Sequence, residues 1–330
     1  MRRLLLSALE QGNMSLLSFK KPRVKYPINK EFYPNANFYN PLRSARLAGY
    51  IGSLFKTPRW VFKDKEIKVT KKSIIGYDGG NFEILIYEPV SAKGISPCLI
   101  YYHGGGFIFG AGEYNYRIAR EYCLRLEAKM IFVNYRLAPK HPHPTPVEDC
   151  YSALKFAYDN ADKYGFDKQK IGVAGESAGG ALSTAVCLMA RDRGIDLPAF
   201  QLLVYPVTDM TMNTESNRKY TDTPVWNSDL SKMMWPAYVP NIERDDLCYA
   251  SPMLAEDFGN LPPAYVETAE FDCLHDEAIN YATAMLKAGV QVEIFETEGT
   301  MHGFDSALDA PTTRKVIDRR IAFMKKHFAK

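Results

Sequence analysis

The chain has 330 residues, of which 46% are hydrophobic and 24% charged, a globular composition that leaves no room for long disorder. This length suits one large α/β domain with insertions, or at most two small domains. The formal net charge of +3 is small and evenly spread, which argues against a nucleic-acid or anionic-membrane partner, and no apolar run is long enough to cross a bilayer.

Residues 1–66 are expected to form a cap segment of short helices over the rest of the molecule, because prolines and aromatic residues interrupt any regular pattern. The first nine residues begin like a signal peptide. Glu10 and Gln11 cut the apolar stretch short, however, and no small-residue cleavage site follows, so we expect an amphipathic helix. The six cysteines are scattered without a C-x-x-C pair, which favours a reduced, cytoplasmic protein.

From residue 67 to 330 the pattern predicts one α/β domain. Residues 82–87 alternate like an antiparallel edge strand, and amphipathic helices follow, two of them at 278–286, ending at Gly289, and at 317–328. Short apolar runs typical of parallel strands buried on both faces alternate with the helices, at 97–103, 130–135, 170–175, 200–205, 264–269 and 291–296. We therefore expect a mostly parallel, doubly wound sheet. The alternation fails between 208 and 250, which we expect to be an insertion that joins the cap.

A serine stands in a sharp turn at the end of one predicted strand. The stretch Gly175-Glu-Ser-Ala-Gly-Gly180 contains a G-x-S-x-G sequence between an apolar strand and a helix. Such a turn exposes the hydroxyl of Ser177 above the sheet, with the backbone N–H of Ala178 beside it. An isolated G-x-S-x-G is equally often a glycine-rich connection without chemistry, so the interpretation depends on the partners of this serine.

A serine hydroxyl needs a base, and the base needs a carboxylate to orient it. His302 lies directly after the strand at 291–296 and is the preferred base, whereas His275 begins a helix and is expected to be a surface or packing residue. Asp272 lies directly after the strand at 264–269 and is the preferred acid. Asp276 and Glu277 compete with it, but their place in the first helical turn suits compensation of the helix dipole.

Three consecutive glycines provide an independent test. His103-Gly-Gly-Gly-Phe107 follows its strand, so backbone N–H groups can approach a ligand without obstruction by side chains. A glycine triplet alone is more often a flexible turn. Together with the serine turn it predicts an oxyanion hole, and the chain order Ser177, Asp272, His302 is the order expected of an α/β-hydrolase.

These motifs resemble those of the hormone-sensitive-lipase-like (HGGG and GxSxG) carboxylesterases of the α/β-hydrolase superfamily, over roughly residues 70–328. The shared stretches include Asn134-Tyr-Arg-Leu-Ala-Pro139, Ala269-Glu-Phe-Asp272 and Met301-His-Gly-Phe304, besides the serine and glycine motifs. The resemblance implies an α/β-hydrolase fold with a helical cap, and Ser177 as nucleophile, Asp272 as acid and His302 as base. It also implies an oxyanion hole formed by the loop Gly104, Gly105 and Gly106 with Ala178, where Gly104 chiefly shapes the turn.

This chain departs from its relatives at Glu176, where they usually carry Asp or Thr, and this puts in doubt the hydrogen bonding around the serine turn. Arg136 and Asp149 lie in shared stretches and are expected to be structural. His141 and His143 alternate with prolines and have no carboxylate or cysteine partner in sequence, so we expect no metal.

The expected activity is that of a serine esterase on short-chain acyl esters, acetyl to about hexanoyl, through an acyl-enzyme and without a cofactor. The cap aromatics Trp226, Trp235 and Tyr238 would restrict the acyl pocket, and none of them singly is assigned that role. Alternatives are an acetyl esterase on acetylated sugars, an amidase, and a non-catalytic small-molecule-binding relative. The expected partner is a small-molecule ester, with neither nucleic acid nor membrane, and a homodimer is compatible with the sequence.

Overall fold

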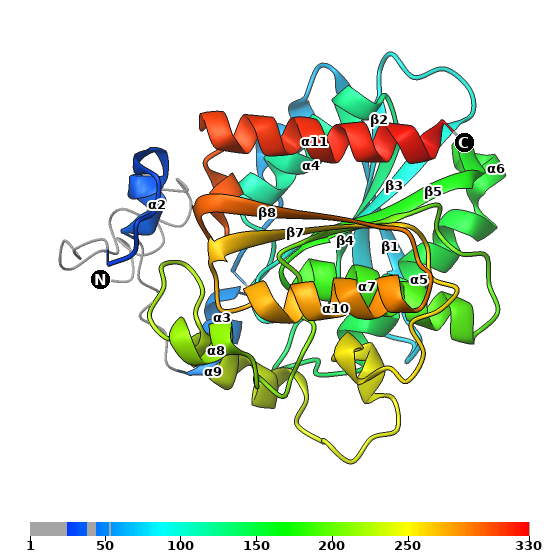
Figure 1. Ribbon diagram of the computed structural model, residues 1–330. Coiled ribbons are helices and arrows are strands. Elements are labelled where there is room, and N and C mark those ends of the chain that lie inside the picture. The colour runs from blue at the N-terminus through cyan, green and yellow to red at the C-terminus, as the bar shows by residue number, and fades with distance from the viewer. Residues whose placement is uncertain (1–24, 38–43, 53, 330) are drawn as a thin grey trace.

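In the computed structural model, the structure describes residues 25–37, 44–52 and 54–329. They form one eight-stranded sheet with helices on both faces (Figure 1). The strands are joined in the order β1-β2-β4-β3-β5-β6-β7-β8. Their bounds are β1 (Ile67–Ile75), β2 (Asn81–Pro89), β3 (Ser96–Tyr102), β4 (Lys129–Asn134), β5 (Phe166–Glu176), β6 (Gln201–Val204), β7 (Ala264–Phe271) and β8 (Val292–Met301).

The six strands β3 to β8 run parallel to one another, whereas β2 pairs antiparallel with both β1 and β4. The expectation that 82–87 forms the edge of the sheet is therefore wrong, although its antiparallel direction is confirmed. The outermost strand is β1, whose sequence Ile-Lys-Val-Thr-Lys-Lys-Ser-Ile-Ile lacks a continuous apolar face. Charged side chains are common on edge strands because they discourage pairing with another chain. In β1 the lysines interrupt the apolar alternation that would have predicted a strand.

Helices α4 (Glu113–Leu126) and α11 (Pro311–Phe328) cover one face of the sheet, and α5 (Thr145–Asp159), α7 (Ala178–Asp192) and α10 (His275–Lys287) cover the other (Figure 1). The short helix α6 (Ala161–Tyr164) precedes β5. The predicted apolar stripe of α10 faces the core through Ala278, Tyr281, Ala282 and Met285, whereas Leu286, which was expected to belong to it, is exposed. This helix ends as expected near Gly289, which has φ +83°.

The cap lies at the carboxyl ends of the parallel strands (Figure 1). From the N-terminal segment it includes α2 (Tyr33–Ala36) and α3 (Ala45–Gly52), with the 3-10 turns η2 (Lys30–Phe32) and η3 (Arg59–Lys63). From the 208–250 insertion it includes α8 (Glu215–Lys219) and α9 (Ser228–Tyr238). The turn η4 (Leu247–Tyr249) instead packs on α7, where Tyr249 donates to Asp192 at the end of that helix, and η5 (Pro252–Leu254) follows. Helices α3 and α9 touch each other. The amphipathic helix expected over residues 1–9 lies outside the described residues.

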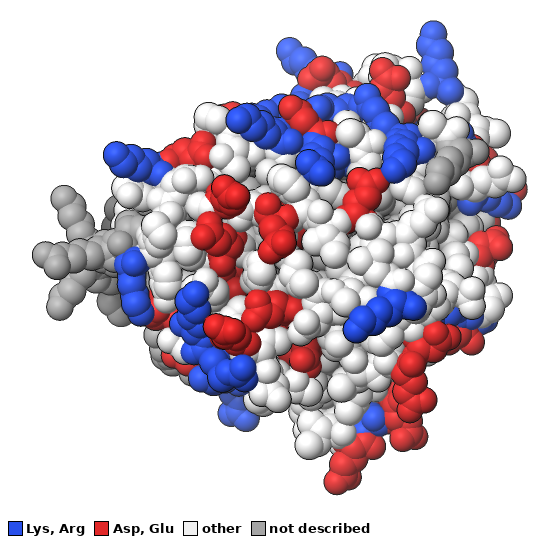
Figure 2. All heavy atoms as spheres, viewed as in Figure 1, with Lys and Arg blue, Asp and Glu red and all other residues white. Residues whose placement is uncertain are grey.

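The surface carries acidic and basic side chains side by side, and both signs are spread over the face in Figure 2, with basic residues prominent along α11. No helix within the described ranges combines the length and apolarity needed to cross a bilayer. Five of the cysteines are buried and Cys248 is half-buried, and all six carry free thiols. Cysteine therefore acts here as a small core residue, as expected from its place in apolar patterns.

Candidate active site

Ser177 occupies a strained turn between β5 and α7. Its backbone has φ +58° and ψ −121°, a conformation that non-glycine residues rarely adopt. The surrounding hydrogen bonds hold it there, because its N–H donates to the carbonyl of Val204 at 2.8 Å and its own carbonyl accepts the N–H of Val207 at 3.2 Å. Strain of this kind persists only where neighbours enforce it, and it is concentrated at functional sites.

Small residues on both sides of the turn are a steric requirement. A Cβ added to Gly175 would come within 2.3 Å of the carbonyl oxygen of Gly179, and one added to Gly179 within 1.9 Å of that of Tyr102. Both contacts involve backbone atoms that cannot give way. The glycines of the G-x-S-x-G sequence thus allow α7 to begin directly against the ends of β3 and β5.

The structure brings the predicted serine, histidine and aspartate together in one chain of hydrogen bonds. His302 Nε2 lies 2.9 Å from Ser177 Oγ, and His302 Nδ1 lies 2.7 Å from Asp272 Oδ2. The other carboxylate oxygen of Asp272 accepts the N–H of Leu274 at 3.0 Å, which fixes the carboxylate in the turn after β7. His302 follows the last residue of β8, which extends five residues beyond the 291–296 run that the apolar pattern indicated.

The competing residues lie in other interactions. His275 begins α10 and contacts Asp276 at 2.9 Å and Glu296 at 3.0 Å. Glu277 is buried, and its carboxylate accepts the N–H of Thr208 at 2.7 Å, so it anchors the start of the cap insertion. Burial raises the pKa of Glu277 to about 8. Dipole compensation alone was therefore an incomplete interpretation of Glu277, because the insertion folds back over the first turn of α10.

The glycine loop faces the serine turn with two unused donors. Gly105 and Gly106 have φ +119° and +57°, and their N–H groups bond to no acceptor within the described part of the chain. Ala178 is the first residue of α7, so its N–H has no acceptor within that helix. The N–H of Gly104 instead donates to Glu176 Oε1 at 2.7 Å. Gly104 is thus excluded as an oxyanion donor, and only its expected part in shaping the turn fits the structure.

Glu176 connects the serine turn to the glycine loop. Besides Gly104, its carboxyl group accepts the hydroxyl of Tyr101 at 2.6 Å and the side-chain amide of Asn115, whose oxygen in turn accepts the N–H of Gly112 at 2.7 Å. Burial raises the pKa of Glu176 to about 8, against the opposing effect of these donors. Sequence reasoning noticed that Glu176 is unusual but could not place its contacts, because they join residues far apart in the chain.

Comparison with known proteins agrees with this arrangement of residues. Residues 99–306 match the model of a family described by the alpha/beta hydrolase fold. The chain is 34% identical to the carboxylesterase NlhH of Mycobacterium tuberculosis over 266 residues, which cover 79% of this chain and 83% of the relative. It belongs to the hormone-sensitive-lipase-like carboxylesterases. As a member of this family, it is a carboxylic ester hydrolase.

Other relatives support this membership. An arylesterase of Saccharolobus solfataricus is 35% identical over 250 residues, covering 75% of this chain and 79% of the relative. The crystal structure of the esterase LipW from Mycobacterium marinum superposes with a TM-score of 0.85 at 26% identity, covering 95% of this chain and all of that one.

Behind the site of this esterase lies a buried charge cluster that sequence reasoning missed. Tyr205 follows β6, and its ring lies tilted against that of His302, with ring centroids 4.5 Å apart, while its hydroxyl donates to Asp305. Asp305 pairs with Arg320 of α11 at 2.8 Å, and Arg320 also binds Glu267 of β7 at 3.0 Å. The position of Tyr205 at the carboxyl end of a strand was the one available signal in sequence.

The two residues expected to be structural do form a structural contact. Arg136 binds Asp149 through Nε at 2.9 Å and Nη2 at 2.7 Å, and it reaches Asp78 with two further bonds.

His143 is buried with its Nε2 atom 3.2 Å from Asp246. In the described residues, no group of three or more His, Cys, Asp or Glu side chains is arranged to hold a metal ion.

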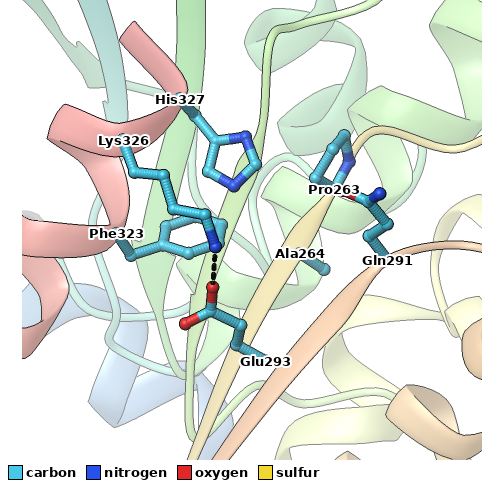
Figure 3. A pocket seen from close by; sticks show the side chains of 7 residues that line it. All are labelled: Pro263, Ala264, Gln291, Glu293, Phe323, Lys326 and His327. Carbon is cyan, nitrogen blue, oxygen red and sulfur yellow. Dashed lines mark hydrogen bonds and ion pairs between the residues drawn. The ribbon is translucent and has the colours of Figure 1, made fainter. Parts of the chain in front are cut away.

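Two cavities lie away from the serine. The smaller, of about 380 Å³, sits at the start of β7 and β8, opposite the catalytic edge, and the ion pair of Lys326 with Glu293 crosses it (Figure 3). The larger, of about 1200 Å³, lies beside the glycine loop between α3 and the segment 134–141. Neither is lined by Ser177, Asp272 or His302. Ser177 is only 4% exposed and His302 5%, so the serine that was expected to be exposed above the sheet is covered in the fold.

Proposed function

We propose that the protein is a serine carboxylesterase of short-chain acyl esters that works through an acyl-enzyme, with Ser177 as nucleophile, His302 as base and Asp272 as the orienting acid. The observation that carries this proposal is the hydrogen-bond chain from Asp272 through His302 to Ser177, which ends beside backbone donors without acceptors. A nucleophile, an oriented base and oxyanion donors together are what acyl transfer requires.

In the first half of the reaction, His302 Nε2 takes the proton of Ser177 Oγ while that oxygen bonds to the ester carbonyl carbon. The carbonyl oxygen becomes an oxyanion, and the N–H groups of Gly105, Gly106 and Ala178 are the donors suited to receive it. The protonated His302 then gives its proton to the departing alkoxy oxygen. The alcohol leaves, and the acyl group stays on Ser177 as an ester.

In the second half, water takes the place of the alcohol. His302 removes a proton from the water as its oxygen attacks the acyl carbon, and the same donors receive the second oxyanion. The intermediate collapses when His302 returns this proton to Ser177 Oγ, so that the carboxylic acid is released. Asp272 keeps the Nδ1–H of His302 directed toward itself throughout, and its carboxylate stabilises the imidazolium that forms in each half.

The preference for acyl chains from acetyl to about hexanoyl rests on the cap. Trp226 and Trp235 of the insertion are both 5% exposed, and Tyr238 is fully buried against Phe107, the residue after the glycine triplet, at a ring distance of 3.7 Å. The cap is thus packed onto the oxyanion loop, which supports a short acyl pocket. Acetylated sugars are a narrower candidate within the same class of small-molecule esters.

The test is a series of p-nitrophenyl esters from acetate to palmitate, assayed with the wild type and with Ser177→Ala as control. We expect the highest kcat/KM between two and about six acyl carbons, and none above background in the variant. Efficient hydrolysis of palmitate would contradict the short-chain preference alone. Absence of turnover with every ester would contradict the esterase proposal and favour a binding protein, and a matched anilide distinguishes an amidase.

A further inference from the structure

The cap insertion places one tryptophan directly against the groups proposed for catalysis. The indole of Trp226 packs on Gly106, so closely that a Cβ added to this glycine would come within 2.4 Å of the indole Cη2 atom. The same indole lies 6.3 Å from the imidazole of His302, between ring centroids. Trp226 therefore contacts the oxyanion loop on one side and approaches the catalytic base on the other.

The backbone that presents this indole is strained. Val225 has φ +65°, which is a genuine outlier for a β-branched residue. The N–H of Trp226 donates to the carbonyl of Pro224 at 2.7 Å, so the three residues form a γ-turn with positive φ at its centre, the rare and strained form of this turn. The side chain of Val225 lies against Gly303, next to His302. The surrounding structure must enforce such a turn.

Three side chains fix the indole in this position. Its Nε1–H donates to Ser231 Oγ of α9 at 2.9 Å, and the carbonyl of Trp226 accepts the hydroxyl of Thr223 at 2.8 Å. Asn227 caps the start of α9 and donates to the carbonyl of Thr223 at 3.1 Å. Both the ring and its backbone are thus anchored, and a bulky substrate cannot displace the indole without breaking hydrogen bonds in a buried region.

The carbonyl carbon must approach Ser177 Oγ to about 3 Å while the carbonyl oxygen lies within hydrogen-bond distance of the oxyanion donors. A ring that touches Gly106 and approaches His302 borders this space. We infer that Trp226 is a specificity-determining residue that excludes esters branched at the carbon next to the carbonyl. This inference rests on the proposed function and adds to it a substrate class, unbranched acyl esters, and the residue that selects it.

Trp235 offers a matched control within the same cap. It is equally buried, at 5% exposure, and lies on α9, but its ring packs on Phe107 and Tyr238 at 6.3 and 6.2 Å between centroids. Neither Gly106 nor His302 is among its described ring contacts. Removal of either tryptophan loosens the cap, whereas only removal of Trp226 opens the space beside the reacting carbon.

The experiment compares p-nitrophenyl butyrate with its branched isomer, p-nitrophenyl isobutyrate, by kcat/KM. Since one methyl group in an apolar pocket changes discrimination by on the order of tenfold, we expect Trp226→Ala to raise the isobutyrate-to-butyrate ratio by roughly that factor. Trp226→Phe should give an intermediate ratio. In Trp235→Ala the two rates should change together and leave the ratio unaltered.

Ser231→Ala keeps the indole but removes its anchor, and should raise the ratio in the same direction to a smaller extent, which keeps the test available if Trp226→Ala fails to fold. If Trp226→Phe and Ser231→Ala fold and hydrolyse butyrate but leave the ratio unchanged, the role of Trp226 is overturned while the esterase proposal stands. An equal rise in Trp235→Ala would also overturn it. Absence of butyrate hydrolysis by the wild type would instead overturn the esterase proposal on which it rests.

Discussion

The carboxyl group of Glu176 accepts the backbone N–H of Gly104 at 2.7 Å and so ties the residue before the nucleophile to the start of the oxyanion loop. Tyr101 and Asn115 hold the same carboxyl group from β3 and α4. The relative position of nucleophile and oxyanion donors therefore depends on a buried side chain that touches neither the substrate nor the base.

Glu176→Ala should lower kcat markedly with little change in KM, because the loop that carries the oxyanion donors loses its support. Loss of one oxyanion donor costs about 10²–10³ in kcat, which sets the upper limit expected here. Glu176→Gln should stay close to the wild type, since its amide can accept from Gly104 and Asn115 and donate to Tyr101. Steady-state kinetics on p-nitrophenyl butyrate measure both. Equal losses in the two variants would argue that loop positioning is not the function of this residue.

The pH dependence of stability should report the same carboxyl group. The ordinary pKa near 4.5 applies to Glu176 in the unfolded chain, whereas burial raises it to about 8 in the fold. Between these values the folded state binds one more proton than the unfolded state, so the free energy of unfolding falls as pH rises, by up to about 1.4 kcal/mol per pH unit.

Urea denaturation at pH 5, 6.5 and 8 tests this effect. Glu176→Gln should show a shallower decline than the wild type. Part of the decline should remain, because burial also raises the pKa of Glu277, to about 8, and that of Glu267. The difference in slope should disappear about one unit above pH 8, where Glu176 is ionised in both the folded and the unfolded state. Parallel declines for the wild type and Glu176→Gln from pH 5 to 8 would mean that Glu176 titrates in the fold as it does in the unfolded chain.

Much of the site was predictable because each of its residues stands directly after a strand. Ser177, Asp272 and His302 follow β5, β7 and β8, which were expected as strands, and parallel strands bring such positions to one edge. The bonds of Glu176 were not predictable, because they span 72 residues to Gly104 and depend on side-chain length. The edge strand β1 was not predictable either, because its lysines interrupt the apolar alternation that indicates a strand.

The assignment of the acid separates two neighbouring aspartates. Asp272→Asn should reduce kcat on the order of ten-thousandfold, as expected when the imidazole loses the partner that sets its tautomer. Asp276→Asn should cost far less, because Asp276 binds the N–H of Ser216 and the ring of His275 and lies outside the hydrogen-bond chain. Circular dichroism confirms that each variant folds. A larger loss in Asp276→Asn would reassign the acid.

The buried cluster behind Tyr205 should matter for stability. Arg320 is 1% exposed and carries two buried carboxylates, Glu267 and Asp305, so Arg320→Met leaves both without their cation. Breaking a buried pair in this way costs roughly 3–5 kcal/mol. Lys326→Met is the control, since its partnership with Glu293 is solvent-exposed and worth about 0–1 kcal/mol. Similar urea midpoints for the two variants would show that the cluster contributes little.

The central claim is that Ser177 is the nucleophile, and covalent labelling tests it most directly. A fluorophosphonate forms a stable bond only with an activated serine, so peptide mass spectrometry of the labelled wild type locates the nucleophile without any assumption about the substrate. We expect one equivalent of label, on Ser177, with no labelling in Ser177→Ala and a strongly reduced rate in the His302→Ala variant. Label on Ser183 or Ser251 while Ser177 remains unmodified would contradict the account.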